Sequence, residues 1–118
     1  MANELNLSAS LSFSKGGAVV DKALTATISV TGDAFSHEIL SIAITTPTLL
    51  VESASLGTPG YVFIKNLDAT NFVSVGITGS YTVKLKAGEF ALFRYASTSL
   101  YAVADTAACL VEYIIIED

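Results

Sequence analysis

Apolar and polar residues alternate strictly along the N-terminal segment of this chain. In residues 5–14 every second residue is apolar, and the residues between them are Asn or Ser. Successive side chains of a β-strand point to opposite faces, so this period of two predicts a half-buried strand. Residues 24–31 repeat the pattern with Thr and Ser as the polar partners. Gly16 and Gly17 lie between the two segments and suit a tight turn that requires positive φ.

Turn residues recur roughly every 8 to 12 positions along the rest of the chain, as in all-β sandwiches. Residues 33–40 are ambiguous between one helical turn and a strand, whereas residues 39–45 favour a strand. Further strands are expected at residues 49–56, 61–64, 72–77, 81–85, 90–95, 100–104 and 109–116. The sequence therefore predicts an all-β fold, a jelly-roll-like or related two-sheet β-sandwich of about eight to nine strands. We expect a single domain over residues 1–118.

The chain carries unusually few charges for its length. Only 14% of its residues are charged and 52% are hydrophobic, whereas about 25% charged residues is typical of globular proteins. Most of the remaining polarity comes from neutral Ser and Thr hydroxyls. A surface with so little charge is prone to association. We therefore expect much of the surface to be covered in the working state.

The C-terminal half has strands that are apolar on both faces, at residues 90–95 and 109–116. A two-sheet sandwich gives each strand only one inward face, so the second apolar face needs a separate cover. Another copy of the chain is the cover we expect, which predicts a homo-oligomer, with a trimer favoured. The candidate interface residues are Phe90, Leu92, Phe93, Tyr95, Tyr113, Ile114 and Ile116.

No residue pattern in the chain predicts a catalytic, cofactor or metal site. The single histidine, His37, has serine and acidic neighbours, but residues adjacent along one strand or turn rarely converge as a catalytic triad does. The single cysteine, Cys109, lies in an apolar run that favours a buried, inert thiol. Asp68 and Asn71 match an Asx-type turn better than an oxygen-lined cation site.

Charge and hydropathy also exclude two classes of partner. The net charge is −5 and the basic residues are scattered, whereas nucleic-acid binding requires clustered positive charge. No stretch approaches the roughly 18 apolar residues of a membrane-spanning helix. The N-terminus has no basic n-region and no long apolar h-region, so no signal peptide is expected.

The second half of the chain contains an ordered succession of short motifs. They are Tyr-Val-Phe-Ile-Lys-Asn at 61–66, Asp-Ala-Thr-Asn at 68–71, Val-Ser-Val-Gly at 73–76, Val-Lys-Leu-Lys-Ala-Gly-Glu at 83–89, Leu-Phe-Arg at 92–94, Leu-Tyr-Ala-Val-Ala-Asp at 100–105 and Val-Glu-Tyr-Ile-Ile-Ile-Glu-Asp at 111–118. In order and spacing this half resembles small β-sandwich virion structural proteins of tailed bacteriophages.

The resemblance implies a protein displayed on the virion, with the capsid surface favoured. Such a chain would be a capsid decoration or cement protein that binds and stabilises the assembled phage head, with the major capsid protein or other virion proteins as partners. The family offers no catalytic motif, so the resemblance assigns no residue a role. A phage tail or head-fibre component is an alternative within the same class.

A carbohydrate-binding β-sandwich module is the alternative from a different class. A row of exposed aromatic residues beside Asp or Asn would favour that function, whereas a symmetric interface that buries the same aromatics would favour the structural role. An enzyme would require a cleft that contains His37. Residues 3–14 are expected to form either an edge strand of the same sandwich or a strand that adds to a partner's sheet edge.

Overall fold

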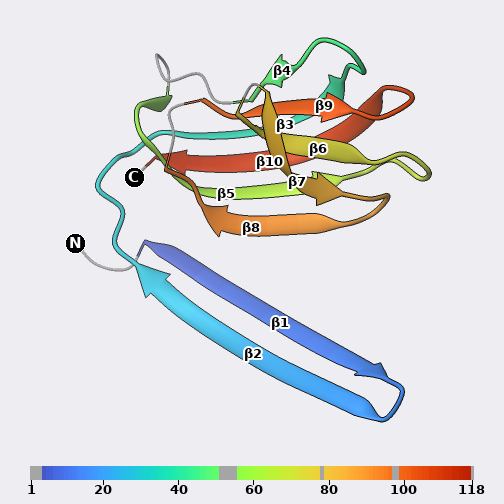
Figure 1. The fold of residues 1–118 in the computed structure, drawn as a ribbon. Helices are drawn as coiled ribbons and strands as arrows, with labels where there is room; N and C mark the ends of the chain where they lie inside the picture. Colours follow the sequence, from blue (N-terminus) through green and yellow to red (C-terminus); the bar gives the residue numbers. More distant parts are fainter. Residues whose placement is uncertain (1–3, 51–55, 78, 97–98, 118) are drawn as a thin grey trace. The chain divides into compact units, whose positions relative to one another are not determined.

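The computed structural model describes residues 4–50, 56–77, 79–96 and 99–117, and ten β-strands lie within them (Figure 1). Their contacts divide the chain into two units, Met1–Thr31 and Gly32–Asp118. The first unit holds a two-stranded sheet and the second holds two four-stranded sheets, so the predicted all-β fold is confirmed. That residues 1–118 form a single domain stays a prediction. No helix within the described residues is long and apolar enough to cross a membrane.

The first unit is a hairpin of β1 (Leu5–Lys15) and β2 (Ala18–Ile28), paired antiparallel along their full length. Gly16 and Gly17 form the turn with φ of 60° and 88°, and positive φ at both central residues is what a tight two-residue hairpin turn requires. β2 begins before the predicted segment 24–31 because this short turn brings residue 18 directly opposite residue 15. β1 belongs to neither sheet of the sandwich, so the expectation of an edge strand in that sandwich is wrong.

The second unit is a sandwich of two antiparallel sheets (Figure 1). Its strands are β3 (Phe35–Ile42), β4 (Thr48–Leu49), β5 (Pro59–Asn66), β6 (Val73–Ile77), β7 (Ser80–Leu85), β8 (Phe90–Arg94), β9 (Tyr101–Ala104) and β10 (Cys109–Glu117). One sheet has the order β3-β10-β5-β8 and the other the order β4-β9-β6-β7. Consecutive strands cross between the sheets except at the β6–β7 hairpin, which gives the expected jelly-roll-like arrangement.

Two expectations for the first crossover need correction. Residues 35–42 form a strand throughout, because each of them pairs with a residue of β10, so the possible helical turn at residues 33–40 is absent. The strand expected at residues 49–56 is represented by Thr48–Leu49 alone, which pairs with β9. Residues 51–55 of that prediction lie outside the described residues.

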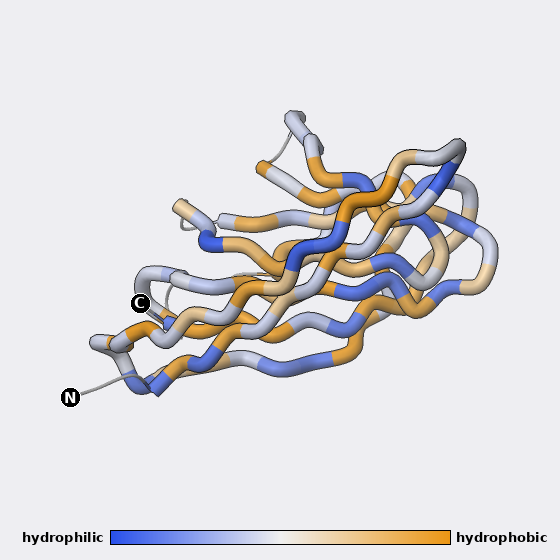
Figure 2. The backbone as a smooth tube through the Cα atoms, turned by 90° about the horizontal axis from the view of Figure 1, so that it is seen from below, coloured by the Kyte–Doolittle hydropathy of each residue, from blue (hydrophilic) through white to orange (hydrophobic). Residues whose placement is uncertain are grey.

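The core of the sandwich is built from one face of each strand. Figure 2 shows hydrophobic and hydrophilic residues following one another along the tube, as period-two strands require. Most inward side chains of the two sheets meet between the layers, and those at the centre of the core are fully buried. Burial of each such aliphatic side chain contributes about 1.5–3 kcal/mol. The largest of them are Ile42, Val62, Ile64, Val73, Val75, Leu100, Val111 and Ile115.

Asn66 is the one buried polar side chain among the described residues, and it ties three segments together. Its amide nitrogen donates to the carbonyls of Asn71 and Leu85, at 2.9 and 3.0 Å. Its side-chain oxygen accepts a hydrogen bond from the backbone N–H of Asp68 at 2.9 Å. The end of β5, the loop that follows it and the end of β7 are therefore held at one point in the core.

The loop after β5 is the Asx-type turn expected from the sequence. The Asp68 carboxylate accepts hydrogen bonds from the backbone N–H groups of Asn71 and Thr70, at 2.7 and 3.0 Å. These two bonds stabilise the charged form and lower the pKa of Asp68 below its ordinary value of 3.8. The carboxylate is therefore already engaged in holding the backbone of its own turn.

We predict that Asn66→Ala lowers the free energy of unfolding by about 3 kcal/mol, because it leaves buried backbone groups without partners. Urea denaturation of the whole chain measures the loss. Asn6→Ala on the exposed hairpin is the matched control and should change stability by less than about 0.5 kcal/mol. Equal stability of the two variants would contradict the structural role of Asn66.

We predict that the stability difference between the wild type and Asp68→Asn depends on pH. Because the folded-state pKa of Asp68 is lowered, its charged form contributes stability that is present above its ordinary pKa of 3.8. That contribution disappears as pH falls through the lowered pKa. Urea denaturation at about pH 7 should therefore show a less stable variant, and the two proteins should converge at about pH 2. A difference that stays constant with pH would contradict this account.

Candidate interaction surface

One broad face of the sandwich consists of the residues of the β3-β10-β5-β8 sheet that point away from the core; we call it the outer face. The strand registers place matching positions of all four strands on this side. Most of the side chains there are apolar. The outer face contains Phe35, His37, Ile39, Ser41, Tyr61, Phe63, Lys65, Phe90, Leu92, Arg94, Leu110, Glu112, Ile114 and Ile116.

Apolar side chains run across three neighbouring strands of the outer face, β10, β5 and β8. Ile114 of β10 lies opposite Phe63 of β5, and Phe63 lies opposite Leu92 of β8. The ring of Phe90 is 6.2 Å from that of Phe63, centroid to centroid. Cross-strand neighbours on one face are close enough to pack together. The outer face therefore carries a contiguous apolar strip rather than scattered single residues.

The apolar side chains of the outer face are unusually exposed. Phe35 is 69% exposed, Phe90 65% and Ile39 55%. The opposite broad side of the sandwich, on the β4-β9-β6-β7 sheet, presents polar residues such as Ser74, Thr82 and Lys84, together with Leu49, Tyr101 and Val103. The outer face carries more exposed large apolar side chains than this side, and such a concentration is typical of a protein contact surface.

The charged residues of the outer face interact with their neighbours on it. His37 Nε2 lies 2.8 Å from Glu112 Oε2, and both side chains are partly exposed. The guanidinium carbon of Arg94 lies 4.8 Å from the centre of the Tyr61 ring. Ser36 points to the other side of β3 from His37, because adjacent strand residues face opposite ways. The histidine therefore has a surface carboxylate partner, and its sequence neighbour Ser36 does not converge with it.

The seven predicted interface residues divide between the two sides of the sheet. Tyr113 is only 3% exposed, and Phe93 and Tyr95 pack against the core with their rings 6.1 Å apart. These three side chains fill the sandwich, which corrects the prediction for them, because alternation places them on the inward side of their strands. The other four lie on the outer face, namely Phe90, Leu92, Ile114 and Ile116.

Four apolar members of the outer face were missed at the sequence level. They could have been found from the alternation of β3, β5 and β10 once the inward residues of those strands were known. The register with β10 and β8 supplies that information, and it is not contained in either strand's own sequence. The missed residues are Phe35, Ile39, Phe63 and Leu110.

The β1–β2 hairpin has an apolar face of its own. Side chains from both strands share this face, and Leu11 and Leu24 are 63% and 60% exposed. The opposite face presents mostly Ser and Thr hydroxyls. A two-stranded hairpin has no second layer and is marginally stable alone in water. It therefore gains stability from any surface that covers its apolar side.

Cys109 is a buried thiol in the core of the sandwich. The Cys109 side chain is fully buried. Burial, and to a lesser degree the charges of Asp68 and Asp105, raise the pKa of the thiol above its ordinary value. A raised pKa disfavours the reactive thiolate. Across residues 4–50, 56–77, 79–96 and 99–117, no three His, Cys, Asp or Glu side chains gather as metal ligands.

Comparison of the chain with protein-family models, curated protein sequences and solved structures finds no match. The chemistry of the outer face and of the hairpin is therefore the basis on which function is inferred.

Proposed function

We propose that this chain is a structural assembly protein that packs through its outer face, and that it serves as a capsid decoration protein of a tailed bacteriophage. The observation that carries the proposal is the exposed apolar strip of the outer face, opposite a polar side on the second sheet. A homo-oligomer, with a trimer favoured, covers this strip and leaves the polar side in water.

The energetic argument starts from the exposed apolar side chains. Contiguous apolar patches larger than a few hundred Å² are uncommon on monomeric proteins and mark contact sites. Each Å² of apolar surface removed from water stabilises an association by about 25 cal/mol. Most outer-face residues are apolar or aromatic, and the charged ones are Lys65, Arg94 and Glu112, so the contact is mainly apolar. Added salt should then weaken it little, because screening acts on charges.

Two observations support a place on a virion. The second half of the sequence resembles small virion structural proteins, and jelly-roll sandwiches are common in viral capsid domains. Fold alone does not determine function, so the surface chemistry remains the main support. A protein that binds only the assembled lattice stabilises it by mass action, and an oligomer that bridges several subunits adds avidity.

The composition of the outer face favours assembly over carbohydrate binding. Its described aromatic residues are Phe35, Tyr61, Phe63 and Phe90, and no Asp or Asn shares the face with them. The carboxylate on this face, Glu112, is paired with His37, and Arg94 lies over the Tyr61 ring, so these polar groups are already engaged by neighbours rather than arranged around a sugar. A phage tail component would pack through the same apolar surface. The surface therefore does not distinguish head from tail, and binding experiments decide between them.

We predict that Leu92→Lys weakens self-association at least tenfold, because it places a charge in the apolar strip of the outer face. Light scattering after size-exclusion chromatography measures the oligomer fraction. Thr82→Lys is the matched control, since it adds the same charge to the exposed polar side. Loss of the oligomer in Leu92→Lys with retention in Thr82→Lys is expected, and an equal response of both variants would contradict the assignment of the contact.

We predict that phage heads lacking this protein survive heating less well, and that adding the purified chain restores their survival. Binding to isolated heads and to isolated tails, measured by co-sedimentation, identifies the location. Restored survival together with head binding is the expected result. Binding to tails alone would transfer the role to the tail, and binding to neither particle would overturn the virion proposal.

A further inference from the structure

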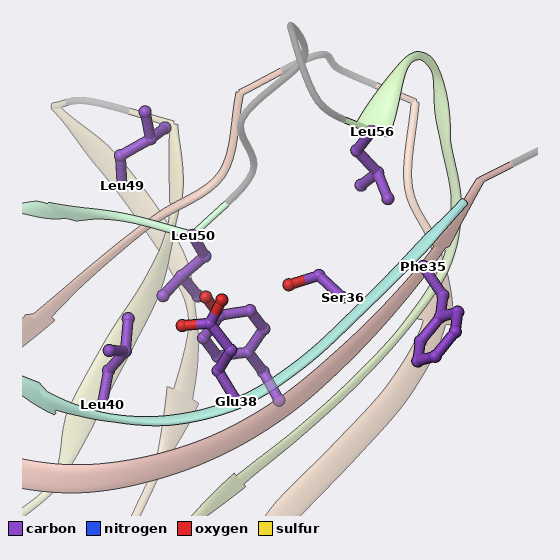
Figure 3. A pocket seen from close by; sticks show the side chains of 8 residues that line it. Phe35, Ser36, Glu38, Leu40, Leu49, Leu50 and Leu56 are labelled. Carbon is purple, nitrogen blue, oxygen red and sulfur yellow. The ribbon is translucent and has the colours of Figure 1, made fainter.

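A pocket of about 460 Å³ opens at the corner of the sandwich where β3 and β4 lie (Figure 3). Both are edge strands of their respective sheets. β4 contains only two residues, so it covers little of the inward side of β3. Four of the eight lining residues are leucines, and Ser36 and Glu38 of β3 add polar side chains. The residues that carry the argument are Ser36, Glu38, Leu40, Leu49, Leu50 and Leu56.

The polar residues of the pocket occupy strand positions that hold apolar side chains in most sandwich strands. Glu38 lies opposite Tyr113 and Ser36 lies opposite Ile115 in the β3–β10 register. Tyr113 and Ile115 belong to the buried core, so Ser36 and Glu38 occupy inward positions of β3. Polar residues at inward positions break the usual pattern of a sandwich strand, and such departures are expected at functional sites.

Glu38 places an exposed carboxylate beside the leucines of the pocket. Figure 3 shows the Glu38 carboxylate beside Leu50 and the Ser36 hydroxyl on the same side of β3, whereas Phe35 points away. In the described part of the chain the Glu38 carboxylate has no hydrogen-bond or ion-pair partner, and no basic residue lines the pocket. A carboxylate in such surroundings is complementary to a cation that carries its own apolar portion.

We propose that this pocket binds an ammonium or guanidinium group on a short aliphatic stem. The stem lies against Leu40, Leu50 and Leu56, and the cationic head donates a charge-assisted hydrogen bond to Glu38. Ser36 accepts a second hydrogen bond from the same head. The volume is within the range of pockets that enclose small ligands. This site shares only Phe35 with the outer face, and it stands whether or not the chain decorates a capsid.

Two sources can supply this chemistry, a free alkylamine and a Lys or Arg side chain of another protein. Both place the same head at Glu38, and they differ in what surrounds the stem. A protein segment brings neighbouring apolar residues that add contacts with the aliphatic wall. A blocked tripeptide, acetyl-Leu-Lys-Leu-amide, and n-pentylamine therefore distinguish the two sources by their relative affinities.

The test is an NMR titration of the whole chain, labelled at its Leu methyl groups, with n-pentylamine, n-pentanol and pentanoate up to about 20 mM. We expect the methyl signals of Leu40, Leu50 and Leu56 to shift as ligand is added. The dissociation constant obtained from these shifts should be at least about tenfold lower for the amine than for the alcohol. Pentanoate, which brings the opposite charge, should bind weakest. No shift of these signals, or equal affinity for amine and alcohol, would overturn the proposal.

Variants then assign the preference to Glu38. Glu38→Gln keeps the size of the side chain, so it should bind n-pentanol as the wild type does but lose the preference for the amine. Asp21→Asn on the hairpin removes the same charge elsewhere and should retain that preference. If Glu38→Gln still bound the amine more tightly than the alcohol, the proposed role of the carboxylate would be contradicted. Tighter binding of the tripeptide than of n-pentylamine assigns the site to a protein partner, and the reverse assigns it to a small amine.

Discussion

Each strand of a two-layer sandwich can give only one face to the shared core, and this geometric constraint shapes the whole second unit. Most inward positions of both sheets hold aliphatic or aromatic side chains, and most of these are buried. The outward positions must meet either water or another molecule. The β4-β9-β6-β7 sheet presents Ser, Thr and Lys outward beside a few apolar side chains, whereas the β3-β10-β5-β8 sheet presents mainly Phe, Ile and Leu. That asymmetry is the physical reason to infer a partner on one side.

Core packing alone does not determine how the crossovers run, and a few polar contacts fix them. Asn66 holds the end of β5 to the following turn and to the end of β7. The Glu117 carboxylate near the end of β10 accepts hydrogen bonds from the backbone N–H groups of Asp33 and Ala34, just before β3 begins. These contacts secure the strand ends of the sandwich, and they leave its outer face and its corner pocket free for other roles.

The sequence predicted the class of fold because alternation is a local property of each strand. It predicted the outer face only in part, since alternation separates two sets of residues without saying which set points inward. Phe93, Tyr95 and Tyr113 were assigned to the surface for this reason, and the register with neighbouring strands places them in the core. The pocket was missed because Ser36 and Glu38 are polar, and polar residues are ordinarily expected to point toward water. The short length of β4 and the early start of β2 follow from how these strands pair with β9 and β1. The sequence of a single strand does not specify its pairing partner or the length of the paired region.

Hydroxyl-radical footprinting tests most directly whether the outer face is covered. The modification rates of Phe35 and Phe90 on the outer face are compared with that of Tyr101 on the opposite sheet, in dilute protein and in the concentrated, assembled state. We predict that Phe35 and Phe90 become protected on assembly while Tyr101 keeps its rate. Unchanged rates at Phe35 and Phe90, as expected from exposures of 69% and 65% in a free chain, would contradict the account.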